Sequence, residues 1–238
     1  MDDLPHFRRI VLKLSGEALK GDQSFGISTP VLQGIAAQIE ELHKLGIEIA
    51  LVTGGGNFFR GIAADELGMG RASADYMGML ATVINGIAIQ DTLEKSGMKT
   101  RLISALEIKE VAEPFIRRRA TRHLEKGRVV IFTAGTGSPF FSTDTAAALR
   151  AIEIQADILL KATMVDGVFS ADPRKVPDAR KFTTISYAEI LSRDLRVMDA
   201  TAVALCRENQ LKIKIFDINK TGSIIEAVHS DRIGTLIQ

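Results

Sequence analysis

The stretch IEIALVTGGGNFFRG (47–61) decides how the chain is to be read, because its aliphatic run stops abruptly at three consecutive glycines. The aliphatic part is typical of a buried β-strand. A glycine run directly after a strand leaves several backbone N–H groups free to converge on an anion. Arg60 adds a planar cation suited to phosphate oxygens. The alternative is an ordinary tight turn in which glycine supplies a positive φ, and this stretch alone does not decide between the two.

Other apolar runs end in small or polar residues in the same way. They are RIVLKLSG (9–16), TRLISA (100–105), RVVIFTAGTG (128–137), DILLKAT (157–163) and LKIKIFDI (211–218). Helical patterns lie between the strands, near 29–45, 72–96 and 142–156, and a capping box is formed by Ser186 and Glu189. This alternation predicts an α/β fold, a three-layer αβα sandwich with a mostly parallel central sheet. Without repeats or an obvious linker, we expect a single domain over residues 1–238.

The strand ends carry the main functional signal. In a parallel sheet, ligands bind beyond the carboxyl ends of the strands. Here those ends read KLSG, TGGG, AGTG and KATMVDG. A Walker A loop is excluded because no Gly-Lys-Ser/Thr follows the glycines, and a dinucleotide fingerprint would need glycine where Phe59 and Phe140 stand. The sequence therefore predicts a phosphate site of another kind.

Lys13 interrupts the apolar strand IVLKLSG, which is costly unless its charge is paired. It either snorkels from an edge strand or points over the carboxyl edge, where Ser15 and Gly16 would supply further donors. In GTGSPFFSTDTAA (135–147), Ser142 and Thr143 can cap a helix whose free amides attract an anion. Two anion-suited loops and a lysine suggest two phosphorylated ligands.

Two features of the 135–147 loop have more than one explanation. Asp144, in the first turn of the helix, either complements the helix dipole or holds a lysine or magnesium. Phe140 and Phe141 are either core residues or the walls of a base pocket.

The overall composition argues against several classes of protein. Lys and Arg total 30 against 29 Asp and Glu, a net charge of +1, so we expect neither nucleic-acid nor membrane binding. The basic stretch IRRRATRHLEKGR (116–128) reads as a solvated helix face. One cysteine, an acidic N-terminus and the lack of an uninterrupted apolar span predict a soluble cytoplasmic protein. With no His/Cys cluster, we expect no protein-bound zinc.

The motifs together resemble those of the bacterial uridylate kinases, which belong to the amino-acid kinase superfamily. The resemblance rests, in chain order, on KLSGEAL (13–19), GGGNFFRG (54–61), the helix carrying Asp75, GTGSPFFSTDTAA (135–147) and KATMVDGVFSADP (161–173). It runs from about residue 8 to the C-terminus. It implies phosphoryl transfer from ATP, which carries Mg²⁺, to UMP, giving UDP and ADP in pyrimidine nucleotide biosynthesis.

The resemblance also implies roles for individual residues. Lys13 and Asp144 would be catalytic, with Asp144 ordering Lys13 and the hydrated magnesium. The ATP phosphates would contact Lys13, Leu14, Ser15, Gly16, Gly56 and Arg60, and the ATP nucleoside would contact Thr163, Phe169 and Asp172. UMP would contact Gly55, Asp75, Thr136, Gly137, Ser138, Pro139, Phe140, Phe141, Ser142 and Thr143. Met164 stands where many relatives carry a lysine. The N-terminal part would thus bind the acceptor and form subunit contacts, and the C-terminal part would bind the nucleoside of ATP.

Assembly and control follow from the same resemblance, which implies a hexamer built of dimers and the effectors GTP and UTP. Residues 74–93 are apolar nearly all round, with only Thr82 and Asn85 polar between Tyr76 and Ile89, so we expect one face of this helix to meet a second subunit. The segment linked to GTP activation would be Gly21, Asp22, Gln23, Ser24, Phe25 and Gly26. Arg101 and Arg128, at the amino ends of their strands, would bind the effector.

Two rival functions stay open. One is a kinase of the same fold that phosphorylates a carboxylate or carbamate, and the other is a nucleotide-binding sensor or storage protein without catalysis. Phosphoryl transfer itself requires mainly positioning and charge neutralisation. A phosphomonoester is largely dianionic at neutral pH, so UMP needs no general base.

Overall fold

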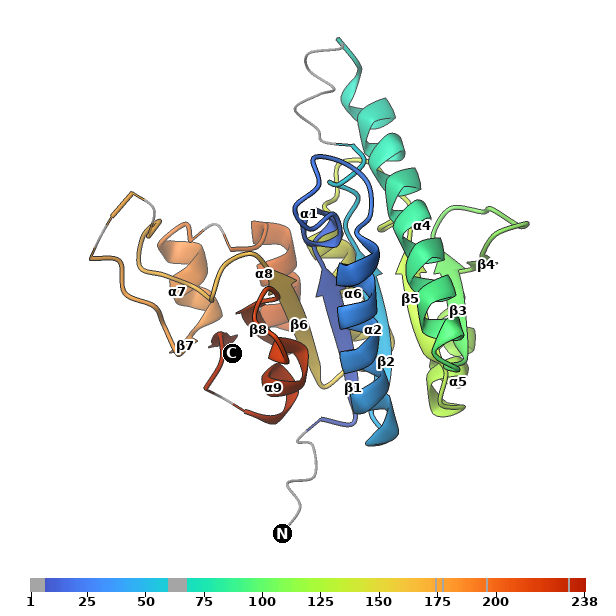
Figure 1. Ribbon diagram of the computed structural model, residues 1–238. Helices are drawn as coiled ribbons and strands as arrows, with labels where there is room; N and C mark the ends of the chain where they lie inside the picture. The colour runs from blue at the N-terminus through green and yellow to red at the C-terminus, as the bar shows by residue number, and fades with distance from the viewer. Residues whose placement is uncertain (1–6, 60–67, 174, 177, 196, 231) are drawn as a thin grey trace.

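The structure is a computed structural model that describes residues 7–59, 68–173, 175–176, 178–195, 197–230 and 232–238 (Figure 1). The strands are β1 (Arg9–Leu14), β2 (Glu48–Thr53), β3 (Thr100–Ser104), β4 (Glu113–Pro114), β5 (Val129–Thr133), β6 (Ile158–Thr163), β7 (Thr184–Ile185), β8 (Lys212–Asp217) and β9 (Thr235–Ile237). The helices are α1 (Gly16–Leu19), α2 (Thr29–Lys44), α4 (Arg71–Lys95), α5 (Arg117–Glu125), α6 (Thr143–Glu153), α7 (Tyr187–Ser192), α8 (Ala200–Glu208) and α9 (Ser223–His229).

Within the described residues, the strands form one nine-stranded sheet in the order β4-β3-β5-β2-β1-β6-β8-β9-β7. Neighbouring strands are parallel except for β8 and β9, which pair antiparallel. β1 lies between β2 and β6, with the first half of the chain on one side of it and the second half on the other. The strand order therefore reverses at β1, which is where α/β sheets form a ligand crevice.

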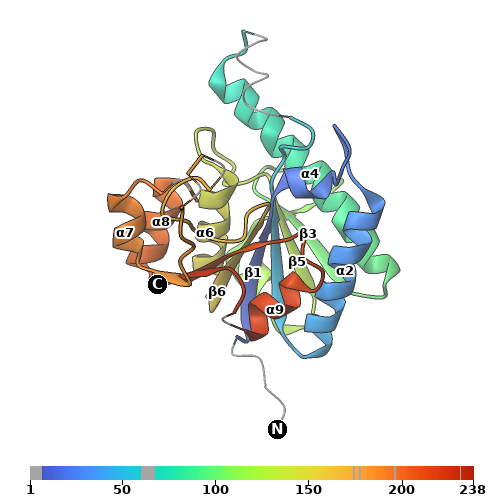
Figure 2. The same ribbon diagram turned by 60° about the vertical axis from the view of Figure 1, so that its left-hand side comes forward.

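Helices cover both faces of this sheet, as the two views show (Figures 1 and 2). On one face α2, α4 and α9 pack on alternate strand residues such as Leu12, Leu51 and Leu160. On the other face α5, α6, α7 and α8 pack on the intervening residues such as Val11 and Leu159. The predicted three-layer αβα sandwich with a mostly parallel sheet is confirmed.

The long elements begin where the sequence predicts. α2 has proline in its first turn, and the Ser142 hydroxyl caps α6 by accepting hydrogen bonds from two backbone amides. The Ser186 hydroxyl accepts from the Glu189 amide at the start of α7, as the capping box requires. β4, β7 and β9 were not predicted, because strands of two or three residues are too short to show an alternating pattern.

α4 carries an apolar stripe that none of the described residues covers. Tyr76, Leu80, Ile84 and Ile87 are each more than 40% exposed and recur at helical spacing on one side. The opposite side packs on the sheet and includes Met79, Val83, Ile89 and Leu93. By length and composition alone α4 could also span a membrane, a test that the core helices of soluble proteins pass as well, and 44% of its apolar stretch is buried.

Candidate active site

The glycine turns after β1 and β2 pack backbone against backbone at the carboxyl edge of the sheet. A Cβ on Gly16 would lie 2.6 Å from the Gly56 nitrogen, and one on Gly54 would lie 2.9 Å from the Gly16 nitrogen. A Cβ on Gly55 would lie 2.6 Å from the carbonyl oxygen of Gly78 in α4. Glycines 54–56 do not have positive φ. The tight-turn explanation is therefore wrong for these glycines. Gly54 and Gly55 are required because another backbone approaches closely, whereas a Cβ on Gly56 would meet only the Glu17 side chain, at 3.4 Å.

Two buried lysines lie side by side near the carboxyl ends of two adjacent strands. Lys13 of β1 and Lys161 of β6 are register partners on adjacent parallel strands, so their side chains project from the same face. Both side chains are about 10% exposed, at 10% and 11%. Of the two explanations for Lys13, snorkelling from an edge strand is wrong, because β1 is a central strand and Lys13 is buried. Lys161 was not predicted, although it interrupts the apolar run DILLKAT in the same manner.

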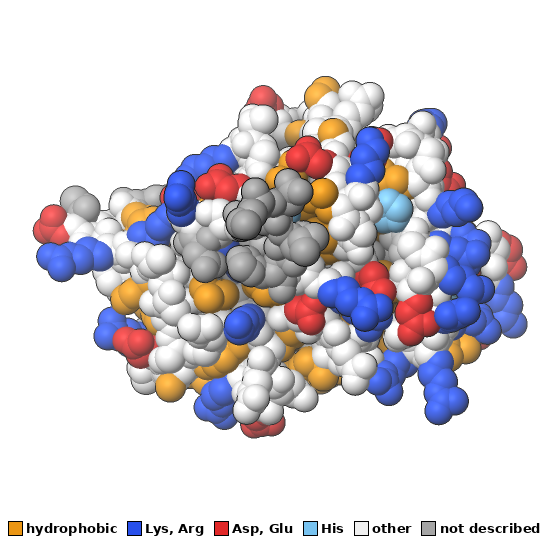
Figure 3. Space-filling model, turned by 90° about the horizontal axis from the view of Figure 1, so that it is seen from below, with side chains coloured by type: hydrophobic (Ala, Val, Ile, Leu, Met, Phe, Trp, Pro, Cys, Tyr) orange, Lys and Arg blue, Asp and Glu red, His pale blue; other side chains and the backbone are white. Residues whose placement is uncertain are grey.

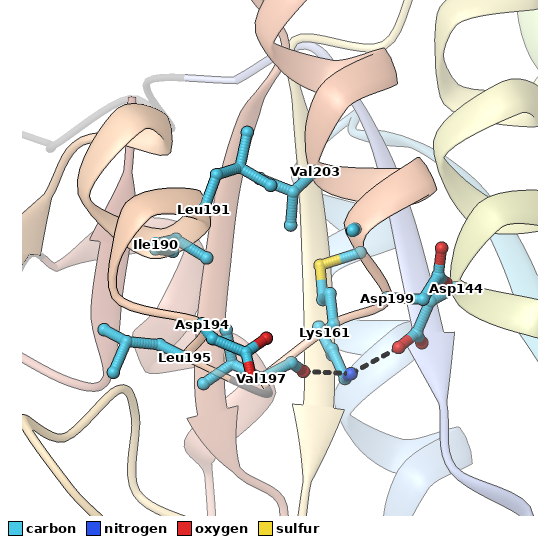
Figure 4. A pocket seen from close by; sticks show the side chains of 11 residues that line it. Asp144, Lys161, Ile190, Leu191, Asp194, Leu195, Val197, Asp199 and Val203 are labelled. Atoms are coloured by element: carbon cyan, nitrogen blue, oxygen red, sulfur yellow. Dashed lines mark hydrogen bonds and ion pairs between the residues drawn. The ribbon is translucent and has the colours of Figure 1, made fainter.

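Asp144 joins the two lysines from the first turn of α6. Its Oδ1 lies 2.8 Å from Lys13 Nζ, and its Oδ2 accepts a hydrogen bond of 2.5 Å from Lys161 Nζ. Lys161 also donates to the Val197 carbonyl oxygen (Figure 4). Oδ1 has an ion-pair contact but no hydrogen bond of good geometry, so it retains acceptor capacity. Of the two explanations for Asp144, the structure favours the one in which it holds lysine.

Burial and charge act in opposite directions on this cluster. Burial by itself would raise the pKa of Asp144, but attraction to Lys13 and Lys161 holds that pKa below its usual value. Burial lowers the pKa of Lys161, against the opposing attraction of Asp144. Asp199 attracts Lys161 more weakly, and its carboxylate is also bonded to Ser142, Thr145 and Ala202. The two ammonium groups thus share the charge of Asp144 directly, an arrangement suited to a further anion.

Asp199 fastens the start of α6 to the start of α8. One carboxylate oxygen accepts from the Thr145 hydroxyl at 2.8 Å and from the Ala202 amide at 2.9 Å, capping α8. The other accepts from the Ser142 hydroxyl, which itself caps α6. Asp199 thus fixes the helix turn that carries Asp144, a role that its sequence position does not reveal. A cavity of about 420 Å³ beside it is lined by Asp144, Lys161 and residues of α7, α8 and the loop between them (Figure 4).

A second cavity, of about 160 Å³, is lined by the glycine turn after β2 together with α4 and the loop after β5. Its wall brings together five predicted acceptor-site residues that are far apart in the sequence. These are Gly55, Asp75, Thr136, Phe141 and Thr143. The Asp75 carboxylate accepts from the Phe140 amide at 2.7 Å and pairs with Arg71 at 2.9 Å, which ties α4 to the loop after β5.

Neither phenylalanine of that loop is a core residue, and of the two only Phe141 lines the second cavity. Phe140 is 68% exposed and Phe141 is 50% exposed. Phe140 has a φ of +73°, an uncommon conformation for a residue with a side chain. Its ring lies 5.7 Å from the Arg71 guanidinium. Thr136 and Ser138 form a short turn by bonding to each other.

The predicted nucleoside residues Thr163, Phe169 and Asp172 lie at the end of β6 and on the loop that follows it, and none lines the cavity beside Lys161. Asp166 secures this loop, since Lys181 Nζ and Lys220 Nζ lie 3.0 and 2.9 Å from its oxygens. Met164 is 46% exposed, and its sulfur lies 3.6 Å from the Asn219 amide nitrogen. Arg60, a predicted phosphate ligand, lies outside the described residues.

The predicted effector arginines lie at the amino edge of the sheet, away from the glycine turns. Arg101 Nε lies 3.4 Å from Glu113, and Arg128 donates to His123 Nδ1 at 2.9 Å. His123 Nε2 in turn lies 3.2 Å from Glu113, so one network includes all four side chains. Seen from this edge, Lys and Arg side chains gather towards the side of β3 and α5 (Figure 3). In the predicted GTP segment, residues 22–25 are exposed.

Residues 8–217 match the amino acid kinase family, and the chain belongs to that family. Its fold is similar to those of solved UMP kinases. The solved UMP kinase from Bacillus anthracis is 36% identical, with a TM-score of 0.95, and the match covers 98% of this chain and 96% of that one.

Two further solved structures extend the comparison. The UMP kinase from Ureaplasma parvum is 38% identical with a TM-score of 0.93, over 97% of this chain and 98% of that one. The uridylate kinase from Archaeoglobus fulgidus is 29% identical with a TM-score of 0.73, over 96% of this chain and 99% of that one. The resemblance to uridylate kinases that the motifs indicate is confirmed.

Proposed function

We propose that this protein is a UMP kinase, which transfers the γ-phosphoryl group of MgATP to UMP and gives UDP and ADP. The observation that carries the proposal is the pair of buried lysines on one carboxylate, flanked by an acceptor cavity and by two glycine turns in backbone contact. The similarity to solved UMP kinases supports the same reaction. A place in pyrimidine nucleotide biosynthesis, in the cytoplasm, follows from that substrate.

The two lysines supply charge neutralisation. Lys13 and Lys161 lie at the strand reversal, where both can face the transferring phosphoryl group as its charge spreads over the equatorial oxygens. Asp144 holds both ammonium groups in place without cancelling their combined charge. In this proposal the backbone amides from Leu14 to Gly16 and at Gly56 hold the donor phosphates.

The acceptor cavity orients UMP. Asp75 and the loop from Thr136 to Thr143 line or border it, and the positive end of the α6 dipole favours the acceptor phosphate. Phe141 forms an apolar wall against which a pyrimidine ring can pack. The attacking phosphate oxygen is already ionised at neutral pH, so the residues have to position it rather than deprotonate it.

Magnesium enters with ATP as charge neutralisation for the phosphates. Within the described residues no group of three or more His, Cys, Asp or Glu side chains could hold a metal ion. Asp144 Oδ1 is a buried carboxylate oxygen without a hydrogen bond of good geometry. This donor set fits an ion that keeps most of its water and binds chiefly through substrate phosphates, as Mg²⁺ does. Asp144 would accept from that hydrated ion.

We also propose a subunit contact and an effector site. The exposed apolar stripe of α4 supports a dimer across this helix, from which a hexamer would be built. GTP and UTP would act at the amino edge through Arg101 and Arg128 and through the segment from Gly21 to Gly26. In this arrangement Thr163, Phe169 and Asp172 hold the ATP nucleoside, and Arg60 contacts the phosphates.

The test is coupled ADP release with UMP, CMP, aspartate and N-acetylglutamate offered in turn. We expect UMP to give the fastest release. The rival kinases of carboxylates or carbamates are not favoured, because their acceptors bring no phosphate for the second anion-suited loop. Release that no acceptor raises above the control without acceptor would instead favour a nucleotide sensor.

A further inference from the structure

The buried side of α4 carries two polar residues that have no direct role in the proposed reaction. Thr82 and Asn85 are the polar residues on its otherwise apolar inner side, and they are 1% and 0% exposed. A buried polar side chain is costly unless its hydrogen bonds are satisfied. The hydrogen-bond partners of these two side chains therefore show which segments α4 holds in place.

Asn85 meets Asn57 of the glycine turn in a reciprocal amide pair. Asn57 Nδ2 donates to Asn85 Oδ1 at 2.9 Å, and Asn85 Nδ2 donates to Asn57 Oδ1 at 2.8 Å. The remaining N–H groups also have acceptors, since Asn85 donates to the Gly54 carbonyl at 2.7 Å and Asn57 donates to the Gly26 carbonyl at 2.9 Å. Those two carbonyls fix which way both amides face, because a flipped amide would place oxygen against oxygen.

The pair lies where the phosphate-binding backbone turns meet. Asn57 Oδ1 would be 2.9 Å from a Cβ on Gly16, so this side chain supports the turn after β1 as well as its own. Asn57 is itself 3% exposed. Its carbonyl also accepts from the Gly26 amide at 3.1 Å, so Gly26 is held by both its donor and its acceptor.

Thr82, one turn earlier on α4, holds the other loop in a similar way. Its hydroxyl accepts from the Ala134 amide at 2.8 Å, directly before the loop from Gly135 to Thr143. The Thr53 hydroxyl donates to the Thr82 carbonyl at 3.2 Å, at the end of β2. The inner side of α4 is thus bonded to both loops that the proposed reaction uses.

We propose that Asn57 and Asn85 are positioning residues for phosphoryl transfer, whose amide pair holds Gly54–Gly56 against Gly16 and couples this turn to segment 21–26 and to α4. The inference rests on the proposed function for its kinetic consequence, though not for the coupling itself. The pair is the polar connection between a helix with an exposed apolar stripe, an exposed loop and the phosphate-binding backbone. A displacement of α4 or of segment 21–26 therefore moves the glycine turn through the side chains of Asn57 and Asn85.

The test compares Asn85→Ser and Asn57→Ser with the control Thr100→Val. Thr100 is also fully buried and bonded to α4, through Gln90 and Glu94, but it lies at the amino edge of the sheet. We expect each asparagine variant to lower kcat by roughly 10- to 100-fold, because a small misplacement of a binding group costs about that much. The double variant should be little worse than either single one, since both remove the same pair. The control should lose stability and keep its kcat within about two-fold.

Hydrogen exchange distinguishes a positioning role of the pair from a merely stabilising one. In Asn85→Ser, the Gly26 amide should exchange faster although it lies far along the chain, while amides of β3 and β5 keep their protection. Kinetic constants within two-fold of wild type in both asparagine variants, or unchanged protection at Gly26, would overturn the proposal. If the wild type fails to phosphorylate UMP, the exchange result still decides the coupling. Should Asn85→Ser not fold, Asn57→Ser tests the same pair from the loop.

Discussion

The centre of the sheet and its outermost strand β4 each hold a carboxylate surrounded by cations, but the two clusters differ in burial. At the centre, Asp144 is 14% exposed between two lysines of similar burial. On β4, Glu113 lies level with Lys13 in the strand register but is 32% exposed, and its partners Arg101 and Arg119 are 37% and 47% exposed. Water screens the second cluster and hardly reaches the first.

The difference in burial indicates which charges take part in the reaction. An exposed ion pair stabilises a protein by about 0–1 kcal/mol, so the arginines around Glu113 can be lost or rearranged at little cost. Removing one partner from a buried group costs far more, because the charges that remain are left uncompensated. We therefore expect large effects around Asp144 and selective, small ones in the network of Glu113 and Arg128.

The largest effect is expected for Asp144→Asn, which removes the carboxylate that pairs directly with the buried Lys13 and Lys161. Turnover should fall by about 10³-fold, and the free energy of unfolding at pH 7 by about 3–5 kcal/mol. In the wild type the pKa of Asp144 is held below its usual value of 3.8. The stability that Asp144 contributes is thus fully present above pH 3.8 and is lost only as pH falls through the lower, folded-state pKa. Denaturant unfolding of both proteins at pH 7 and below pH 3.8 checks this, and equal stabilities at pH 7 would contradict it.

Lys161→Met comes next, and Lys214→Met is its matched control. Lys214 is also a buried lysine, on the strand beside β6, but it projects from the opposite face and donates to the Ser230 carbonyl. We expect kcat to fall by roughly 10²-fold in Lys161→Met, since it removes one phosphoryl-neutralising cation. It should stay within about three-fold in Lys214→Met. Equal losses in the two variants would mean that lysine burial, not position, explains the effect.

Leu80→Glu tests the α4 stripe, where the expected change is in assembly. A charge in the centre of an apolar contact is costly to bury, so the oligomer should dissociate. Light scattering at micromolar concentration should give a wild-type mass that is an even multiple of the 25.9 kDa chain and a lower mass for the variant. Lys95→Glu, exposed on the same helix outside the stripe, should leave the mass unchanged. A monomeric wild type would refute the proposed dimer.

The smallest change in basal activity is expected for Arg128→Ala at the amino edge. UMP phosphorylation should stay within a few-fold of the wild-type rate, because this guanidinium bonds to His123 and lies at the opposite edge from the glycine turns. The response to GTP should disappear if the effector binds there and prefers one state of the assembly. Arg122→Ala, exposed on α5, is the control and should respond normally. If GTP does not change the rate of UMP phosphorylation by the wild type, the proposed effector site is wrong.

The central strands could be predicted because each is a long apolar run between helices, whereas β4, β7 and β9 offered too few residues. Lys13 was found because a lysine inside an apolar strand demands a partner. Lys161 gives the same signal, but its register with Lys13 depends on which strands become neighbours. The amide pair of Asn57 and Asn85 could not be foreseen either, since hydrogen bonds between residues 28 positions apart follow from packing rather than from local pattern.

The most direct test of the account is to compare UMP binding with turnover in Lys13→Ala. If Lys13 neutralises charge that develops during transfer, kcat should fall by about 10³-fold while the dissociation constant of UMP changes by only a few-fold. Calorimetric titration with UMP and measurement of UDP formation from ATP give the two quantities on the same preparation. A variant that loses UMP affinity but keeps its kcat, or a wild type that forms no UDP, would contradict the account.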